Sequence, residues 1–167
     1  MKFVSRITAL AAGTLACLAV QPAFAQQGLF RMQNVGLGPA LSLDLGNLPG
    51  VSQLVAMALP TAQPLGQYWD LRGGRTGGDV RLGNLFAGGG KCLDTDGDGF
   101  LYMDGCGPQI GQRWQIRESN GGVELTNSFK PGQCLDHARL GNGVIAPRLV
   151  PCNGSPNQRW TISVTGK

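Results

Sequence analysis

Few side chains in this sequence are of the types that carry out acid, base or nucleophilic catalysis. The 167 residues contain one histidine, His137, which directly follows Asp136. No Gly-x-Ser-x-Gly motif or catalytic-cysteine context accompanies it, as a hydrolytic triad would require. The two glutamates, Glu118 and Glu124, lie in turn or strand contexts, and a carboxylate pair for glycoside cleavage could be assembled from the acidic residues of any chain. We therefore expect no enzyme and no catalytic residue.

An acidic run at residues 94–99, Asp-Thr-Asp-Gly-Asp-Gly, looks like the start of an EF-hand calcium loop. The twelfth position of such a loop needs a bidentate glutamate, and here it is Gly105. We interpret the run as an acidic loop, with a weak calcium site that assists ligand binding as the alternative. Zinc would need close Cys-x-x-Cys pairs, which are absent. We expect neither a metal nor a cofactor.

The N-terminal residues indicate export. Lys2 and Arg6 precede an apolar run over residues 7–20, and Ala-Phe-Ala at residues 23–25 follows as a small-x-small cleavage site. The run is shorter than the roughly 20 residues of a membrane span, so we expect no span. We predict a secretory signal over residues 1–25 and a secreted chain, periplasmic or extracellular, over residues 26–167.

Removal of the signal leaves 142 residues beginning at Gln26, which is the size of one domain. A lipoprotein anchored at Cys17 is the alternative, but the sequence lacks a leucine three residues upstream. Loss of Cys17 also turns five cysteines into an even set, namely Cys92, Cys106, Cys134 and Cys152. An even set in an exported chain indicates disulfides, and four cysteines allow three pairings.

The charge distribution gives no sign of a nucleic-acid partner. The full chain has a net charge of +4, and without Lys2 and Arg6 it has 12 basic and 10 acidic residues. These basic residues are scattered singly and form no clustered stripe, which a phosphate-binding surface would need.

Three similar units follow one another along the mature chain, at about residues 29–73, 78–118 and 121–164. Each begins with an alternating apolar and polar segment that ends in asparagine, at residues 30–34, 80–84 and 123–127. Strict alternation is typical of a half-buried β-strand.

Two shorter motifs recur in the same order within each unit. A segment that closes on Leu-Asp ends at Asp44, Asp94 and Asp136. A Gln-x-Trp triplet follows it, as Gln67 to Trp69, Gln112 to Trp114 and Gln158 to Trp160. Since these are the only tryptophans, we expect them to fill one shared core while the glutamines satisfy buried backbone groups of the loops.

The rest of the chain is dense in glycine and carries no sustained helical spacing of apolar residues. Residues 53–59 are the only candidate for a helix, and prolines bracket them. We predict an all-β domain of many short strands joined by turns.

The three Gln-x-Trp triplets, with Cys-Leu-Asp in the second and third units, resemble the ricin B-type lectin domain over roughly residues 29–164. The resemblance implies a β-trefoil of three pseudo-repeats. It also implies two disulfides within repeats, Cys92 with Cys106 and Cys134 with Cys152, each contributing about 3 kcal/mol. The first repeat departs from the pattern, because Ser42 replaces the first cysteine and no partner cysteine lies near Leu59. Packing alone must hold its loop.

Galactose-binding members of that family use the aspartate of Leu-Asp, an aromatic residue two positions before the second cysteine, and an asparagine directly before the Gln of the triplet. A carboxylate and an amide orient vicinal hydroxyls, while the ring stacks on the apolar face of the sugar. The third repeat matches at Asp136, Asn157 and Gln158, but Val150 stands in place of the ring. His137 is its alternative ring or donor.

The other two repeats match less well. The second has Asp94 and Gln112, with Tyr102 near the ring position that Asp104 occupies and Gly111 in place of the asparagine. The first has Asp44, with Met57 at the approximate ring position and Gly66 in place of the asparagine. We rank the repeats third, second, first as sugar sites. The alternative for each aspartate is that it only organises its own turn by accepting backbone N–H groups.

The resemblance implies a secreted, non-catalytic lectin that binds galactose-like or related glycans. The alternative is a degenerate trefoil that serves as a protein-interaction or host-cell-binding subunit, with a catalytic partner protein, in a multicomponent toxin or enzyme complex. The missing cysteines and aromatics are similar to the ricin-like A and C subunits of cytolethal distending toxins. An inhibitor of a protease or glycosidase is a third hypothesis, without support from any residue.

Overall fold

The computed structural model describes residues 28–38, 41–45, 55–58, 65–73, 78–141 and 143–164. The expected signal segment, Cys17 and Gln26 lie outside the described residues. Within them, the chain forms strands and short 3-10 turns, and it has no helix long and apolar enough to cross a membrane.

Each repeat supplies four strands and one 3-10 turn. The first contains β1 (Phe30–Asn34), β2 (Ser42–Leu45), β3 (Val55–Ala58), η2 (Leu65–Gln67) and β4 (Trp69–Arg72). The second contains β5 (Arg81–Asn84), β6 (Lys91–Thr95), β7 (Leu101–Gly105), η3 (Ile110–Gln112) and β8 (Trp114–Ser119). The third contains β9 (Gly122–Asn127), β10 (Lys130–Arg139), β11 (Ile145–Pro151), η4 (Pro156–Gln158) and β12 (Trp160–Val164).

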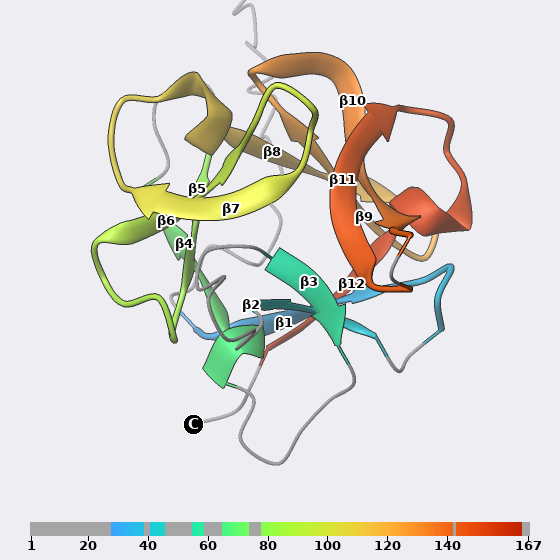
Figure 1. The fold of residues 1–167 in the computed structure, drawn as a ribbon, viewed down its shortest axis with the longest axis horizontal. Helices are drawn as coiled ribbons and strands as arrows, with labels where there is room; N and C mark the ends of the chain where they lie inside the picture. Colours follow the sequence, from blue (N-terminus) through green and yellow to red (C-terminus); the bar gives the residue numbers. More distant parts are fainter. Residues whose placement is uncertain are drawn as a thin grey trace, which may run out of the picture.

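Two kinds of antiparallel strand pair build the fold. The pairs β2–β3, β6–β7 and β10–β11 form within a repeat. The pairs β4–β5 and β8–β9 join consecutive repeats, and β12–β1 joins the third repeat back to the first. Figure 1 shows β3, β7 and β11 arranged around the centre of the view. The all-β prediction and the β-trefoil implied by the resemblance are confirmed.

The alternating segments form strands with one buried and one half-buried face. In β1, Phe30, Met32 and Asn34 are buried, whereas Arg31 and Gln33 are partly exposed. The same alternation runs through β9. Since successive side chains of a strand point to opposite faces, one face packs into the core and the other meets solvent.

The three tryptophans occupy the centre of this core. Each begins the last strand of its repeat and is fully buried within one apolar cluster. Each indole Nε1 donates a hydrogen bond to the carbonyl of the leucine in the Leu-Asp motif, with the partners Leu43 at 2.9 Å, Leu93 at 3.0 Å and Leu135 at 2.9 Å. The prediction of a shared tryptophan core is confirmed, and the bond ties the two motifs of each repeat together.

The one helix candidate of the sequence, residues 53–59, is a strand over the part that the structure describes. Residues 55–58 form the strand β3, which pairs with β2 so that Val55 lies opposite Leu45 and Met57 opposite Leu43. Val55 and Met57 are buried, and the two alanines are half-buried. Burial of alternate side chains against β2 outweighs the helix propensity of alanine and methionine.

Both disulfides implied by the resemblance are present. Cys92 is bonded to Cys106 and Cys134 to Cys152, each with a Cα–Cα distance of 4.9 Å. Each bond ties the beginning of an intra-repeat hairpin to the loop that precedes the 3-10 turn. Ser42, at the corresponding position of the first repeat, is fully buried.

Candidate functional site

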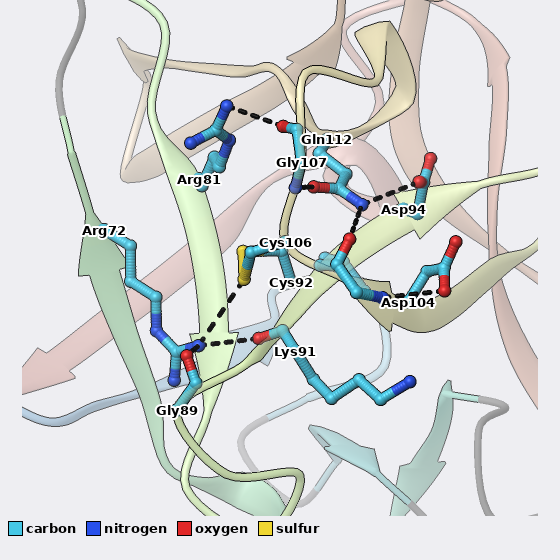
Figure 2. Close-up of a disulfide and its surroundings, with 12 residues drawn as sticks. Arg72, Arg81, Gly89, Lys91, Cys92, Asp94, Asp104, Cys106, Gly107 and Gln112 are labelled. Atoms are coloured by element: carbon cyan, nitrogen blue, oxygen red, sulfur yellow. Dashed lines mark hydrogen bonds between the residues drawn. A yellow bond between two sulfur atoms is a disulfide. The ribbon is translucent and has the colours of Figure 1, made fainter.

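The glutamine of the second repeat organises the loop next to its aspartate. Gln112 is fully buried. Its Nε2 donates to Asp94 Oδ2 at 3.1 Å and to the carbonyl of Gly105 at 2.8 Å, while its Oε1 accepts the N–H of Gly107 at 2.9 Å (Figure 2). The amide therefore joins the aspartate to the loop that carries Cys106, as expected for a glutamine that satisfies buried backbone groups.

In the third repeat, Gln158 likewise forms hydrogen bonds with the loop that carries Cys152. Gln158 donates to the carbonyl of Pro151 at 3.0 Å and accepts the N–H of Asn153 at 2.7 Å. The structure records no hydrogen bond between Gln158 and Asp136, both of which it describes. In the first repeat, Gln67 donates to Asp44 Oδ2 at 3.1 Å. Glutamine and aspartate are thus hydrogen-bonded in the first and second repeats.

The three aspartates sit in different environments. Asp94 is 4% exposed and Asp136 is 7% exposed. One oxygen of each accepts the next backbone N–H, that of Thr95 at 2.8 Å and that of His137 at 2.6 Å. Burial raises the pKa of Asp44 above the usual carboxyl value, although the bond from Gln67 opposes this. The turn-organising contact expected of these aspartates exists in the second and third repeats.

An aromatic ring lies beside the aspartate in the second repeat. Tyr102 on β7 is directly opposite Asp94 on β6, and Asp104 is opposite Cys92. Cross-strand partners project from the same face of a hairpin, so the ring adjoins the carboxylate. Burial raises the pKa of the Tyr102 hydroxyl, and the charges of Asp94, Asp104 and Asp96 raise it further.

The corresponding positions of the other repeats hold no aromatic ring. Ala56 lies opposite Asp44, and Arg148 lies opposite Asp136. The Arg148 guanidinium stacks on Phe100 of the second repeat, 4.9 Å from the ring centroid. Val150 is opposite Cys134, at the position that Asp104 occupies in the second repeat. The second repeat alone, among the described hairpins, places a ring directly across from its aspartate.

Two predicted residues of the third repeat have contacts away from Asp136. Asn157 packs its side chain against Gly36 of the first repeat, where a Cβ on Gly36 would lie 2.0 Å from Asn157 Oδ1. His137 is the neighbour of Asp136 on β10, so it leaves the strand on the opposite face. Its Nε2 is buried and has no hydrogen-bond partner among the described residues. The contact between this pair that the structure gives is the bond from the His137 backbone N–H to Asp136.

Glycines replace the expected asparagine in the first two repeats for a steric reason. A Cβ on Gly111 would lie 2.0 Å from Asp94 Oδ1, and one on Gly66 would lie 2.2 Å from Asp44 Oδ1. Each carboxylate therefore fills the space that an asparagine side chain would need. In these repeats, the aspartate and the glutamine form the polar part of the candidate site.

The asparagines that end the alternating segments have a role that the sequence analysis missed. Each is buried and donates from Nδ2 to the carbonyl of the residue before the glutamine of the preceding repeat. The bonds run from Asn34 to Asn157 at 2.6 Å, from Asn84 to Gly66 at 2.7 Å and from Asn127 to Gly111 at 2.7 Å. The signal was the recurrence of asparagine at one position of all three segments.

The acidic run forms the turn of the β6–β7 hairpin. Asp96 Oδ1 accepts the N–H groups of Asp98 at 2.9 Å and Phe100 at 2.8 Å. Gly99, with φ of 86°, supplies the left-handed residue that this turn needs. Over the described part of the chain, no three His, Cys, Asp or Glu side chains gather in a way that could hold a metal ion.

A family model for the ricin-type beta-trefoil lectin domain matches residues 28–160, and the chain belongs to this family. A 77-residue segment, 46% of the chain, is 39% identical to a protein named probable alpha-galactosidase A from Aspergillus clavatus, of which it spans 13%. The designed 3-fold symmetric protein ThreeFoil superposes with a TM-score of 0.67 at 20% identity, covering 83% of this chain and 99% of that one. The cytolethal distending toxin of Haemophilus ducreyi superposes with a TM-score of 0.62 at 17% identity, covering 87% of each chain. These two structures share the fold.

Proposed function

We propose that this protein is a non-catalytic lectin whose principal saccharide site lies in the second repeat, on Asp94, Gln112 and Tyr102. The observation that carries the proposal is the position of the Tyr102 ring directly opposite Asp94, whose carboxylate is hydrogen-bonded to Gln112. Membership of a lectin family supports carbohydrate as the ligand. We therefore rank the second repeat first, whereas the sequence ranked the third repeat first.

The site has the chemical parts that saccharide binding needs. Asp94 uses one oxygen for Gln112 and the other for the N–H of Thr95, and a carboxylate has further lone pairs that accept sugar hydroxyls. The two bonds hold the carboxylate in one orientation. The half-buried Tyr102 ring offers a surface for the apolar C–H face of a pyranose. A single site of this kind binds with a Kd of about 1 mM, or about −4 kcal/mol.

The ligand that we propose is a galactose-like or related glycan, which is bound and not altered. The match to a protein named as a probable alpha-galactosidase supports this class, since such an enzyme acts on galactosides.

We also propose that residues 1–25 are a secretory signal and that the protein functions outside the cytoplasm. The two disulfides support this location, because such bonds persist in oxidising compartments. The same location suits a protein whose ligands are extracellular glycans.

A second candidate function is that of a binding subunit in a multicomponent complex. The observation in its favour is that Ala56 and Arg148 stand where the first and third repeats would need a ring. Three apolar side chains near the junction of the first two repeats, Leu65, Leu85 and Phe86, are each between 44% and 48% exposed, and such side chains suit contact with a protein partner. The shared fold with a cytolethal distending toxin structure is compatible with this role.

Glycan binding by two matched variants separates these functions. Tyr102→Ala removes the ring, and we expect about a tenfold loss of affinity for the best glycan on an array, measured by titration calorimetry. Asn157→Ala, at the third-repeat position, should bind like the unmodified protein. Loss of binding in Asn157→Ala but not in Tyr102→Ala would contradict the location of the site. No glycan binding, together with a stably copurifying protein, would favour the subunit function.

A further inference from the structure

One face of the β6–β7 hairpin carries an unusual set of side chains. Leu101 and Met103 of β7 are buried in the core, so Tyr102 and Asp104 between and after them project from the opposite face. The pairing with β6 places Asp94 on this same face, opposite Tyr102. A ring is thus flanked along the hairpin by two carboxylates. Figure 2 shows the hydrogen bond between Gln112 and Asp94, and the Asp104 carboxylate hydrogen-bonded to the backbone beside it.

No cation of the described chain neutralises these carboxylates. The one ion pair among the described residues joins Arg72 to Asp70. Asp104 accepts a hydrogen bond only from the backbone N–H of Gly105, at 2.7 Å. Lys91 of β6 lies opposite Gly105, next to Asp104, and forms no ion pair with Asp94 or Asp104. At the tip of the hairpin, Lys130 and Arg148 donate to the carbonyls of Gly97 and Asp98. Within the described chain, Asp94 and Asp104 therefore have no ion-pair partner.

The other two repeats provide an internal comparison. The position of Asp104 is taken by Ala58 in the first repeat and by Val150 in the third. The position of Tyr102 is taken by Ala56 and Arg148. Among the described hairpin residues, the second repeat alone has an aromatic ring beside two carboxylates without an ion-pair partner.

A ring face and adjacent carboxylates are the groups that recognise an ammonium ion. The ring attracts a cation through its quadrupole, and each carboxylate attracts it by charge. A neutral sugar can donate its hydroxyls to either carboxylate, but a cationic ligand is also attracted to Asp104 by charge, and a neutral sugar is not. The second carboxylate therefore favours a ligand that carries positive charge.

We propose that the second-repeat site selects saccharides that bear a protonated amine, such as 2-amino-2-deoxy sugars, with Asp104 as the residue that determines this preference. The inference rests on the proposed lectin function, since it assumes that the site binds a pyranose. Tyr102 and Asp94 hold the ring of the sugar, and the ammonium group lies toward Asp104.

Titration of the full chain with galactosamine, galactose and N-acetylgalactosamine tests this specificity. At about pH 6 the amine is protonated, because amino groups of this kind lose their proton near pH 8. We expect galactosamine to bind roughly fivefold more tightly than the two neutral sugars, as exposed cation–π and ion-pair contacts would give. The preference should shrink in high salt.

Two variants with the same change in net charge provide the control. Asp104→Asn should bind galactosamine and galactose equally. Asp98→Asn, at the exposed tip of the same hairpin, should retain the preference. Equal binding of all three sugars by the unmodified protein, or a preference that survives Asp104→Asn, would overturn the inference and leave the lectin function standing. If the protein binds none of the three sugars and no glycan on an array, the lectin function is overturned, and this inference with it.

Discussion

At the scale of single residues, the buried asparagines show how one side chain connects two repeats. Asn127 donates from Nδ2 to the carbonyl of Gly111 at 2.7 Å and accepts the N–H of Phe129 at Oδ1 at 2.9 Å. Asn84 makes the same pair of contacts with Gly66 and Phe86. Because the carbonyl belongs to the 3-10 turn of the preceding repeat, each asparagine fixes the turn that bears the Gln-x-Trp glutamine.

Replacement of such an asparagine should be costly. We expect Asn127→Ala to lower the free energy of unfolding by about 2 kcal/mol, because it leaves the Gly111 carbonyl buried without a donor. Denaturant unfolding followed by tryptophan fluorescence would measure this change. Gln109→Ala, which shortens an exposed amide side chain, is the control and should unfold like the unmodified protein. Equal stability of the two variants would contradict the role assigned to Asn127.

At the scale of elements, the first repeat is tied to the disulfide of the second. Arg72, at the end of β4, donates from Nη1 to the carbonyls of Gly89 at 2.8 Å and Lys91 at 2.7 Å, and its Nη1 lies 3.8 Å from Cys106 Sγ (Figure 2). Asp70 holds the guanidinium with an ion pair of 3.0 Å. The first repeat, which has no disulfide of its own, is thus hydrogen-bonded to the disulfide-linked part of the second repeat.

The fork of the Arg72 guanidinium explains why lysine should not replace it. We expect Arg72→Lys to lower the free energy of unfolding by about 1 to 2 kcal/mol, since one ammonium cannot reach the same set of carbonyls. Thermal or denaturant unfolding under non-reducing conditions would show the loss. Arg117→Lys, on an exposed site of β8, serves as the comparison. A loss of the same size in both variants would mean that the contacts to the Gly89 turn contribute nothing specific.

Strands could be predicted where apolar and polar residues alternate within one short segment. The alternating segments at β1 and β9 are strands because a period of two shows directly in the sequence. β3 escaped prediction because four residues of valine, alanine and methionine suit a helix as well as a strand, and only the pairing with β2 decides between them.

At the scale of the whole molecule, threefold symmetry applies to the core and not to the candidate site. All three tryptophans are buried in the same way. Gln112 and Gln158 each donate a hydrogen bond to a carbonyl at the end of the hairpin of their own repeat. The residues opposite the three aspartates are Ala56, Tyr102 and Arg148. The trefoil therefore preserves its packing in each repeat while the exposed faces of its hairpins diverge.

The location of the candidate site could be predicted from the sequence only in part. The candidate aspartates and glutamines follow from the repeated motifs, which the sequence shows directly. Counting back from the second cysteine, however, pointed to Asp104 and Val150 as ring positions. The register of each hairpin, which sets Tyr102 against Asp94, is a tertiary property that no motif encodes.

A heteronuclear NMR titration with galactose or galactosamine, followed by backbone amide shifts, tests most directly whether the second repeat is the saccharide-binding one. We expect shifts concentrated at Asp94, Tyr102 and Gln112, with a stoichiometry of one sugar per chain. Shifts of equal size around Asp136 and Gln158, or shifts confined to the third repeat, would contradict a site in the second repeat.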